Sequence, residues 1–178
     1  TGVRLAVALV QGMALALDRP VVGVSTLAAL AHAAPGAGPV LAAIDARMGE
    51  VYVCGFDRGG PVPLPWAAET VLPPDQVPMP AVDVTAVGTG FSAADGLLAQ
   101  RLRPRLLACV DDALPRAEDV AALAVHAFAA GQAVDAEQLQ PAYLRDRVAL
   151  TISERAAARG DAGQGNPGHH PAAPESGA

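Results

Sequence analysis

Residues 1–17 read TGVRLAVALVQGMALAL, and this opening stretch determines how the rest of the chain has to be arranged. As a helix it is apolar nearly all the way round. Only Arg4 and Gln11 interrupt it, and because they stand seven residues apart they fall on one narrow stripe. At ~1.5 Å per residue, the helix is too short to cross a bilayer of ~30 Å. The stretch therefore predicts either a helix buried in its own domain or a helix at an interface with another protein.

Small side chains recur every four residues along this helix, at Ala8, Gly12 and Ala16. A glycine in a helix interior costs roughly 1 kcal/mol relative to alanine. A partner helix that packs closely against this ridge is one reason for a sequence to keep such a glycine. Burial inside the domain is the commoner explanation of an apolar helix, so the residues alone favour burial over an interface.

The composition limits the classes of function. The chain has 178 residues, 52% of them hydrophobic, which is enough for one domain or two small lobes with a core. The net charge is −6 and the basic residues, all Arg, form no run, so the chain is a poor nucleic-acid binder by itself. Cys54 and Cys109 lack C-x-x-C spacing and are predicted to be buried, reduced thiols of a cytoplasmic protein. No signal peptide is visible, and the start at Thr1 instead of Met suggests a missing N-terminal segment.

Cap and turn signals divide the first part of the chain. Pro20 ends the opening helix, Ser25 is a suitable N-cap, and Gly49 can adopt the positive φ of a tight turn. These signals predict a short buried strand at 21–24, a helix at 26–33, and a β-hairpin whose strands cover 40–46 and 50–56.

The second part alternates strands and helices, as in an α/β layer. The patterns predict an edge strand within 67–72, a strand at 83–87, a helix through Arg101 opened by a capping box at 92–95, a strand at 106–110 and a helix at 117–130 that Gly131 caps. The spacing in this last helix predicts a core face of Val120, Leu123, Ala124, Ala127 and Phe128.

Few residues have the spacing of a chemical site. The turn Gly88-Thr89-Gly90 lies between a strand and a helix, where backbone N–H groups can cradle a phosphate, and Asp45 and Glu50 flank the hairpin turn, where carboxylates can bind Mg²⁺. In both cases a structural explanation, steric or solvent-driven, is favoured. His32 and His126 have no clustered ligand nearby and are predicted to be structural. The sequence holds no P-loop, G-x-S-x-G or H-E-x-x-H motif, so spacing alone does not indicate a self-sufficient enzyme.

Five segments together resemble the TsaB (YeaZ) family over roughly residues 1–148. They are TGVR at 1–4, PVVGVSTLAAL at 20–30, IDARMGEVY at 44–52, VGTG at 87–90 and PAYLRD at 141–146. The resemblance implies an ASKHA-like (actin/sugar-kinase/Hsp70-type) α/β fold with two lobes. Residues 1–38 would be the remainder of an N-terminal lobe, 39–150 the second lobe and 151–178 a disordered tail. The family has further strands and a Gly-Pro-Gly-Ser-Phe segment before the first motif, so the first lobe is expected to be incomplete.

The resemblance also implies a function. TsaB is a non-catalytic subunit of the bacterial complex that adds a threonylcarbamoyl group to N6 of adenosine 37 in tRNAs reading ANN codons. This implies a heterodimer with the catalytic paralogue TsaD, joint work with the ATPase TsaE, tRNA contact only through the complex, and no cofactor of its own, with ATP and Mg²⁺ at the complex interface. An interface role for the opening helix is then favoured over burial.

The resemblance assigns residues to these roles. The partner interface is expected to contain Arg4, Ala8, Gln11, Gly12, Ala16, Leu27 and Leu30, and Asp45, Gly88 and Gly90 are expected near a nucleotide. TsaD carries a metal-binding His-x-x-x-His where this chain has Thr26 and Leu30, which cannot replace imidazole ligands, so neither a metal nor a catalytic residue is expected. Two alternatives stay open: a stand-alone ASKHA-type ATPase or phosphotransferase, and a scaffold that homodimerises through the same helices.

Overall fold

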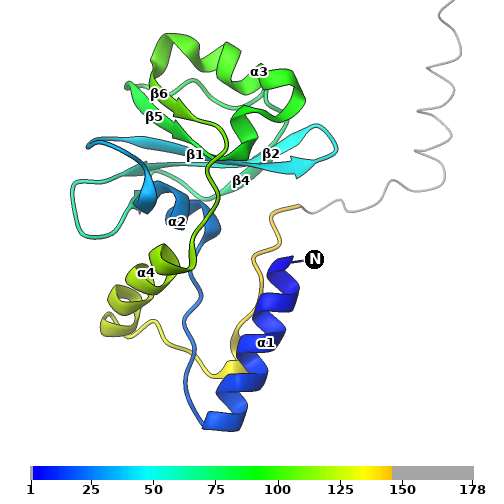
Figure 1. The fold of residues 1–178 in the computed structure, drawn as a ribbon, viewed down its shortest axis with the longest axis vertical. Helices are drawn as coiled ribbons and strands as arrows, with labels where there is room; N and C mark the ends of the chain where they lie inside the picture. Colours follow the sequence, from blue (N-terminus) through cyan, green and yellow to red (C-terminus); the bar gives the residue numbers. More distant parts are fainter. Residues whose placement is uncertain (1, 146–178) are drawn as a thin grey trace, which may run out of the picture. The chain divides into compact units, whose positions relative to one another are not determined.

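The computed structural model describes residues 2–145, and Thr1–Leu144 cluster as one compact unit. Figure 1 shows a mixed sheet with helices on both of its faces. In chain order the elements are α1 (Gly2–Leu17), α2 (Thr26–Ala33), β1 (Val40–Arg47), β2 (Glu50–Asp57), β3 (Leu64–Pro65), β4 (Thr70–Leu72), β5 (Val84–Val87), η1 (Thr89–Phe91), α3 (Ala93–Leu102), η2 (Arg103–Arg105), β6 (Leu106–Val110), α4 (Ala117–Ala129) and η3 (Ala136–Gln138).

The sheet is built outward from the hairpin β1–β2, which confirms the hairpin prediction. Its order is β3-β2-β1-β5-β6, with β4 also pairing with β2. Strands β1 and β2 are antiparallel, whereas β1, β5 and β6 run parallel. At the hairpin turn Gly49 has φ 76°, as predicted, but Arg47 (φ 64°) and Met48 (φ 57°) are also left-handed. The mixed α/β sheet fits the predicted fold class. Helix α2, which precedes residue 38, packs directly on the sheet, which follows it, so α2 and the sheet share one core within the described residues.

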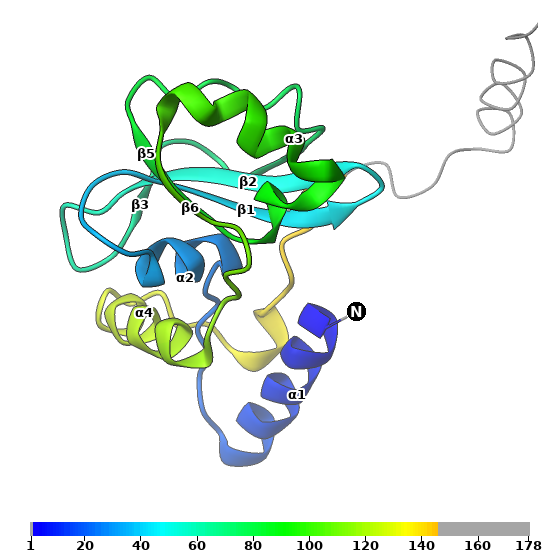
Figure 2. The ribbon, with the colours of Figure 1, turned by 45° about the horizontal axis from the view of Figure 1, so that its top comes forward.

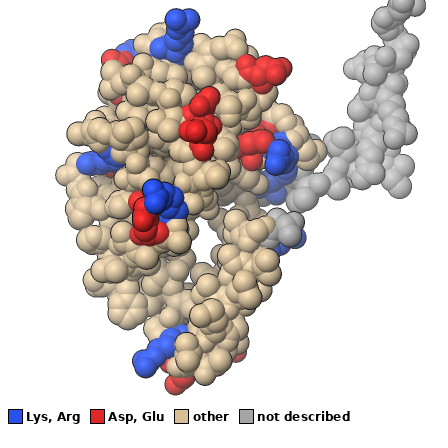
Figure 3. Space-filling model, in the orientation of Figure 1, with Lys and Arg blue, Asp and Glu red and all other residues tan. Residues whose placement is uncertain are grey.

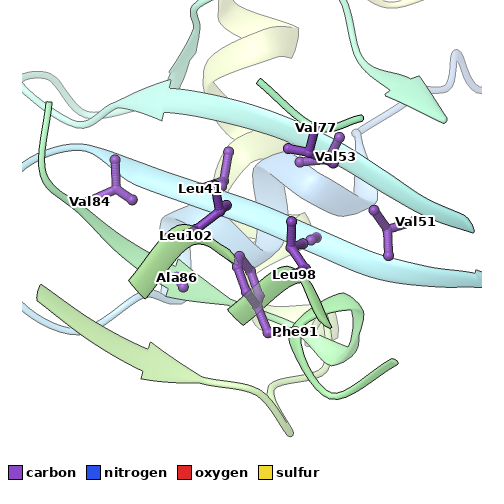
Figure 4. Packing of buried hydrophobic residues seen from close by; sticks show 10 residues of the cluster. Leu41, Val51, Val53, Val77, Val84, Ala86, Phe91, Leu98 and Leu102 are labelled. Atoms are coloured by element: carbon purple, nitrogen blue, oxygen red, sulfur yellow. The ribbon is translucent and has the colours of Figure 1, made fainter. Parts of the chain in front are cut away.

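Period-two alternation in β1 divides the core into two layers. Leu41 and Ala43 point to one face, where they pack with α3, while Val40 and Ala42 point to the other face, which α2 covers. Both faces are buried, which explains why the strand reads as one apolar run. Figure 4 shows the α3 layer at close range, with Phe91, Leu98 and Leu102 lying against the β1 and β5 side chains.

A third, smaller cluster holds α1. It consists of Ala14, Val21 and Ala136, with Val134 and Leu139 packed against it. The predicted strand at 21–24 is wrong, because within the described residues Val21 makes a single antiparallel bridge to Val134 (N···O 2.8 and 2.9 Å) and no sheet continues from it. Bridge and cluster together tie the end of α1 to the segment after α4.

The start of α3 differs from the prediction. Ser92 makes no helix-capping bond; its hydroxyl donates to the carbonyls of Thr89 (3.1 Å) and Asp111 (3.3 Å). The three residues Ala94, Asp95 and Gly96 all have positive φ, so the first turn of α3 is not right-handed helix. The capping-box pattern is therefore wrong here, because the hydroxyl is bonded to the neighbouring turn and to the end of β6.

Helix α4 is less buried than its spacing predicts. Leu123 is buried as expected and Ala124 and Ala127 are half-buried, but Val120 is 36% exposed and Phe128 is 58% exposed, so the predicted core face is wrong for these two residues. Gly131 follows the helix with φ 74° and donates to Phe128 O (3.0 Å), which confirms the predicted cap. The predicted tail at 151–178 lies outside the described residues.

Candidate partner interface

Helix α1 exposes most of its apolar surface. Among its described residues Ala14 alone is buried. Its large exposed side chains range from 44% to 65% exposure: Val3, Leu5, Leu9, Val10, Met13, Leu15 and Leu17. The interpretation of this stretch as a helix buried in its own domain is therefore wrong for this chain. Figure 3 shows that, in the view drawn, charged side chains are sparse over the part of the surface that α1 forms.

The polar stripe of α1 fastens the helix to the chain's own backbone. Gln11 Nε2 donates to the carbonyl oxygens of Ala136 (3.0 Å) and Leu139 (2.9 Å). The Arg4 guanidinium lies 5.3 Å from the ring centroid of Tyr143, within cation–π range. Arg4 and Gln11 thus make contacts inside the unit, and these contacts decide which side of α1 stays open.

The ridge of small residues lies on the open side of α1. Ala8, Gly12 and Ala16 are all exposed. A Cβ built on Gly12 meets no atom within 4 Å. No part of the described chain fills the space above this glycine, so a second helix could approach the α1 backbone closely there.

Leu27 and Leu30 do not belong to the open surface. They are 2% and 1% exposed and form the α2 layer of the core with Val40, Phe56 and Val87. Their expected place at the partner interface is corrected accordingly, because an amphipathic helix next to a sheet directs its largest apolar residues to the sheet.

The N-terminus of α2 is capped by its own chain. Ser25 Oγ accepts hydrogen bonds from the N–H groups of Leu27 and Ala28 (both 3.1 Å) and donates to Glu69 Oε1. Ser25 is thus the predicted N-cap, and Glu69 supplies a carboxylate at the positive end of the helix. Among residues 2–145, no group of three or more His, Cys, Asp or Glu side chains could hold a metal ion.

Gly88 and Gly90 are explained by steric requirements. A Cβ on Gly88 (φ 105°) would lie 2.3 Å from Ala43 O, and a Cβ on Gly90 would lie 2.7 Å from Ala43 Cβ. Both glycines are buried, and the Gly88 N–H donates to Val110 O (2.9 Å). That N–H is consequently not available to a phosphate, and the turn is glycine-rich because η1 passes close to β1.

Asp45 lies beside the glycine turn, at the rim of an open pocket. Its carboxylate accepts from the N–H of Arg47 (2.7 Å) and forms an ion pair with the Arg47 guanidinium (3.1 Å). Asp45 N–H donates to Thr89 Oγ1 (3.3 Å). The pocket measures about 450 Å³ and is lined by Ile44, Asp45, Arg47, Thr89, Ser92, Ala93 and Leu114. Of the three residues expected near a nucleotide, Asp45 alone lines this pocket.

The predictions for His32 and for the two cysteines have different outcomes. His32 Nδ1 lies 2.8 Å from Asp119 Oδ1, and Asp119 is 8% exposed, so His32 has the structural role predicted for it, through a partner that was not predicted. The cysteine prediction holds for Cys54, which is buried, and fails for Cys109, which is exposed. Burial is the main cause that raises the pKa of the Cys54 thiol to about 11, and the nearby Glu69 carboxylate adds to it.

Sequence reasoning missed Tyr143, Glu69 and Asp119. Each contacts a residue far away along the chain: Tyr143 contacts Arg4, Glu69 contacts Ser25 and Asp119 contacts His32. Local patterns carry no signal for such contacts. For Asp119 one sign was available: it lies one helical turn before Leu123, on the apolar side of α4, where a carboxylate needs a partner from within the protein.

None of the helices between residues 2 and 145 combines the length and apolarity needed to span a bilayer.

Known proteins resemble this chain in sequence and in fold. Residues 1–152 match the family model described as TsaD, tRNA N6-adenosine threonylcarbamoyltransferase. The chain is 38% identical over 157 residues to the tRNA threonylcarbamoyladenosine biosynthesis protein TsaB of Escherichia coli, covering 84% of this chain and 67% of that protein. It is 34% identical over 162 residues to TsaB of Haemophilus influenzae, covering 83% of this chain and 66% of that protein.

Solved structures agree with these relatives. YeaZ from Pseudomonas aeruginosa has a TM-score of 0.74 at 44% identity, over 81% of this chain and 68% of that one. A Pseudomonas aeruginosa protein described as uncharacterized, with similarity to peptidase YEAZ, has a TM-score of 0.73 at 43% identity, over 82% and 68%. The chain spans about two thirds of the length of these proteins. It belongs to the TsaB/YeaZ family of tRNA threonylcarbamoyladenosine biosynthesis proteins.

Proposed function

We propose that this chain acts as a non-catalytic subunit in the formation of threonylcarbamoyladenosine on tRNA, and that it does so by binding the catalytic subunit TsaD through α1. The observation that carries the proposal is the open apolar side of α1 with its ridge of Ala8, Gly12 and Ala16. Large exposed apolar patches on a folded protein mark interaction sites. The paralogous TsaD is the partner of choice because residues 1–152 fit the TsaD family model, so a matching helix in the partner can pack in a pseudo-symmetric way.

The side chains around α2 support a non-catalytic role. The positions that resemble the His-x-x-x-His of TsaD are Thr26 and Leu30, and Leu30 is 1% exposed within the core. A buried leucine cannot serve as a metal ligand. The chain therefore contributes shape and position to the complex in this proposal, while TsaD supplies the chemistry, TsaE supplies ATPase activity, and tRNA is held by the complex.

Nucleotide contact is placed at the pocket beside Asp45 in this proposal. The pocket offers the Asp45 carboxylate and the hydroxyls of Thr89 and Ser92, and it is open on one side, as a site completed by a second protein would be. The packed glycines Gly88 and Gly90 supply no cradle. The isolated chain should accordingly show no heat of ATP binding by calorimetry with Mg²⁺ present. A micromolar dissociation constant for the isolated chain would favour the stand-alone ATPase alternative instead.

Reconstitution tests the proposal. TsaD and TsaE are incubated with ATP, threonylcarbamoyl donor and tRNA, with and without this chain, and modified tRNA is measured by mass spectrometry. The proposal expects product only when TsaD and the chain are both present. Product formed by the chain in the absence of TsaD, or the same yield with and without the chain, would refute the non-catalytic subunit role.

A further inference from the structure

The first turn of α3 has the opposite hand to an ordinary α-helix. Ala94 (φ 48°, ψ 53°), Asp95 (φ 56°, ψ 29°) and Gly96 (φ 73°, ψ 21°) are three consecutive residues in the left-handed region. Glycine, and occasionally asparagine or aspartate, adopts this region as a single residue, whereas a left-handed run brings each Cβ too close to the following carbonyl oxygen. With alanine at 94 and aspartate at 95 the turn is strained, so other contacts have to hold it.

Side chains on both sides of the turn supply such contacts. Ser92 Oγ donates to the carbonyls of Thr89 (3.1 Å) and Asp111 (3.3 Å), and Gln100 Nε2 donates to the carbonyl of Asp95 (2.9 Å). In a right-handed helix the Asp95 carbonyl would accept the N–H of the residue four positions later instead, so the Gln100 bond belongs to the observed form. All of these hydrogen bonds are exposed, and each contributes modestly to stability.

The sequence of the same turn favours a right-handed helix. Ser92 and Asp95 have the spacing of a capping box, in which the serine oxygen accepts the N–H of Asp95 and the carboxylate accepts the N–H of Ser92. Ala94 lies four residues before Leu98 and eight before Leu102, and both leucines are buried in the α3 layer. A right-handed first turn would therefore place Ala94 on the buried side of α3. Such a conflict between local preference and observed form is expected of an element with two forms of similar free energy.

The core permits both forms of the turn. Phe91 precedes it and Leu98 follows it, at 1% and 0% exposure, and Figure 4 shows both side chains against the sheet. Helix α3 lies on the face of the sheet opposite to α2 (Figure 2), and Ser92, Ala94 and Asp95 are exposed. A left-handed turn is the mirror image of a right-handed one and rises equally per residue, so a change of hand keeps the length of the segment.

The turn borders the open pocket of about 450 Å³ described above. Ser92 and Ala93 line one part of this pocket and Leu114 lines another. The bond from Ser92 Oγ to the carbonyl of Asp111 joins the start of α3 to the segment that leads to Leu114. A further left-handed residue, Arg47 (φ 64°), also lines the pocket. Strained residues of this kind cluster at binding sites and switch regions.

We propose that residues 92–97 form a two-state strap at this pocket, left-handed in the closed form described here and right-handed in an open form. In the open form Ser92 Oγ accepts the N–H of Asp95, so its bond to Asp111 O breaks and its hydroxyl hydrogen can donate to an oxygen atom inside the pocket. A ligand with such an acceptor oxygen binds the open form more tightly and shifts the strap toward it. The identity of that ligand rests on the proposed function, whereas the change of hand is a property of this chain alone.

Two reciprocal substitutions test the change of hand in the full chain, without nucleotide or TsaD. Gly96→Ala disfavours the left-handed form and favours a right-handed helix, and the nearest atom to the added Cβ is Phe91 O at 3.7 Å, so no clash arises. Ala94→Gly has the opposite preference in the same turn. NMR spectroscopy measures the one-bond Cα–Hα coupling of Asp95, which distinguishes positive from negative φ, and relaxation dispersion measures the population of a minor form.

Gly96→Ala should shift the ratio of the two forms about tenfold or more toward the right-handed one, and Ala94→Gly about tenfold or more the other way. Gly12→Ala, outside the strap, is the control and should leave Asp95 unchanged. A positive φ at Asp95 in Gly96→Ala with no exchange would overturn the proposal. If Gly96→Ala does not fold, the unsubstituted chain and Ala94→Gly decide: exchange at Asp95 should be present in the first and suppressed in the second, and any other result would overturn the proposal.

Control of the pocket is tested in the reconstituted complex with TsaD, through its dissociation constant for ATP. Gly96→Ala should lower this constant and Ala94→Gly should raise it. Asp45→Asn separates the two ideas, because it changes a carboxylate of the pocket outside the strap. If Asp45→Asn changes the constant and the strap variants do not, the strap does not control the pocket. If Asp45→Asn has no effect either, the proposed nucleotide contact is refuted, and the NMR result still decides whether the turn has two forms.

Discussion

Gly12 and Gly88 lie in opposite surroundings, one open and one crowded. Substitution by alanine should therefore change the free energy of unfolding in opposite directions at the two positions. At Gly12 a Cβ meets nothing within 4 Å, so Gly12→Ala should raise the free energy of unfolding by about 0.5–1 kcal/mol through helix propensity. At Gly88 (φ 105°) a Cβ would lie 2.3 Å from Ala43 O, so Gly88→Ala should lower it by about 1–3 kcal/mol. Urea unfolding of both variants checks this, and a loss of stability in Gly12→Ala would contradict the open ridge.

The two cysteines should react at different rates. The pKa of Cys54 is raised from 9.0 to about 11, mainly by burial, so its reactive thiolate is rare at neutral pH. Because the folded state favours the protonated thiol, its contribution to stability is complete below pH 9 and is lost as the pH rises toward 11. Iodoacetamide at pH 8, followed by peptide mass spectrometry, should label the exposed Cys109 much faster than Cys54. Equal rates would show that Cys54 is not enclosed.

At the residue scale, the sequence predicted the role of a residue correctly where neighbouring residues in the chain determine that role. Ser25 caps α2 and Gly49 turns the hairpin as their residue types imply. The burial of Leu30 depends on which side of α2 meets the sheet, and the pairing of His32 depends on Asp119, 87 residues later. Such contacts follow from the tertiary arrangement, which local propensity does not contain.

At the scale of the element, two serines before helices differ in what they do. Ser25 Oγ accepts from two N–H groups of α2, whereas Ser92 Oγ caps nothing in α3. Ser25→Ala should therefore cost about 1 kcal/mol of unfolding free energy, and Ser92→Ala less than half of that. Thermal unfolding followed by circular dichroism measures both. A larger loss for Ser92→Ala would contradict this ranking and would mean that the bonds from Ser92 Oγ to Thr89 O and Asp111 O stabilise the protein more than the Ser25 cap does.

Helix α4 has few buried residues, which makes it sensitive to the loss of one side-chain contact. Its buried residues are Asp119 and Leu123, and Asp119 contacts His32 on α2 at 2.8 Å. Asp119→Ala should speed amide hydrogen exchange in α4 about tenfold or more and leave β1 unchanged. The neighbouring Glu118→Ala removes an exposed ion pair with Arg116 and serves as the control. Equal exchange in both variants would show that the His32–Asp119 contact does not hold the helix.

Strong periodicity explains which elements were predictable. The hairpin strands and α1 show sustained patterns, and the structure has them with nearly the expected bounds. The left-handed residues at the start of α3 were not predictable, because alanine disfavours positive φ and aspartate, although enriched there, adopts it in a minority of cases. The predicted strand at 21–24 does not form, because a strand needs a neighbouring strand to pair with. Among the described residues Val21 pairs at a single position, with Val134.

At the scale of the whole molecule, family membership was predictable from five short segments, and the mixed sheet follows from their order. The sequence did not predict which side of α1 is open. That side is determined by the contacts that Gln11 and Arg4 make with the segment after α4. The resulting molecule has a packed sheet with α2 and α3 on its two faces, and a helix α1 whose apolar surface lacks a cover among the described residues.

The most direct measurement is the affinity of this chain for TsaD when the α1 ridge is blocked. Gly12→Leu fills the open space on α1, and Gly59→Leu adds the same side chain at an exposed loop glycine with equally free surroundings. Biolayer interferometry with immobilised TsaD should show that Gly12→Leu weakens binding at least about a hundredfold, while Gly59→Leu binds as the unsubstituted chain does. Unchanged binding of Gly12→Leu would contradict the assignment of α1 as the surface that TsaD recognises.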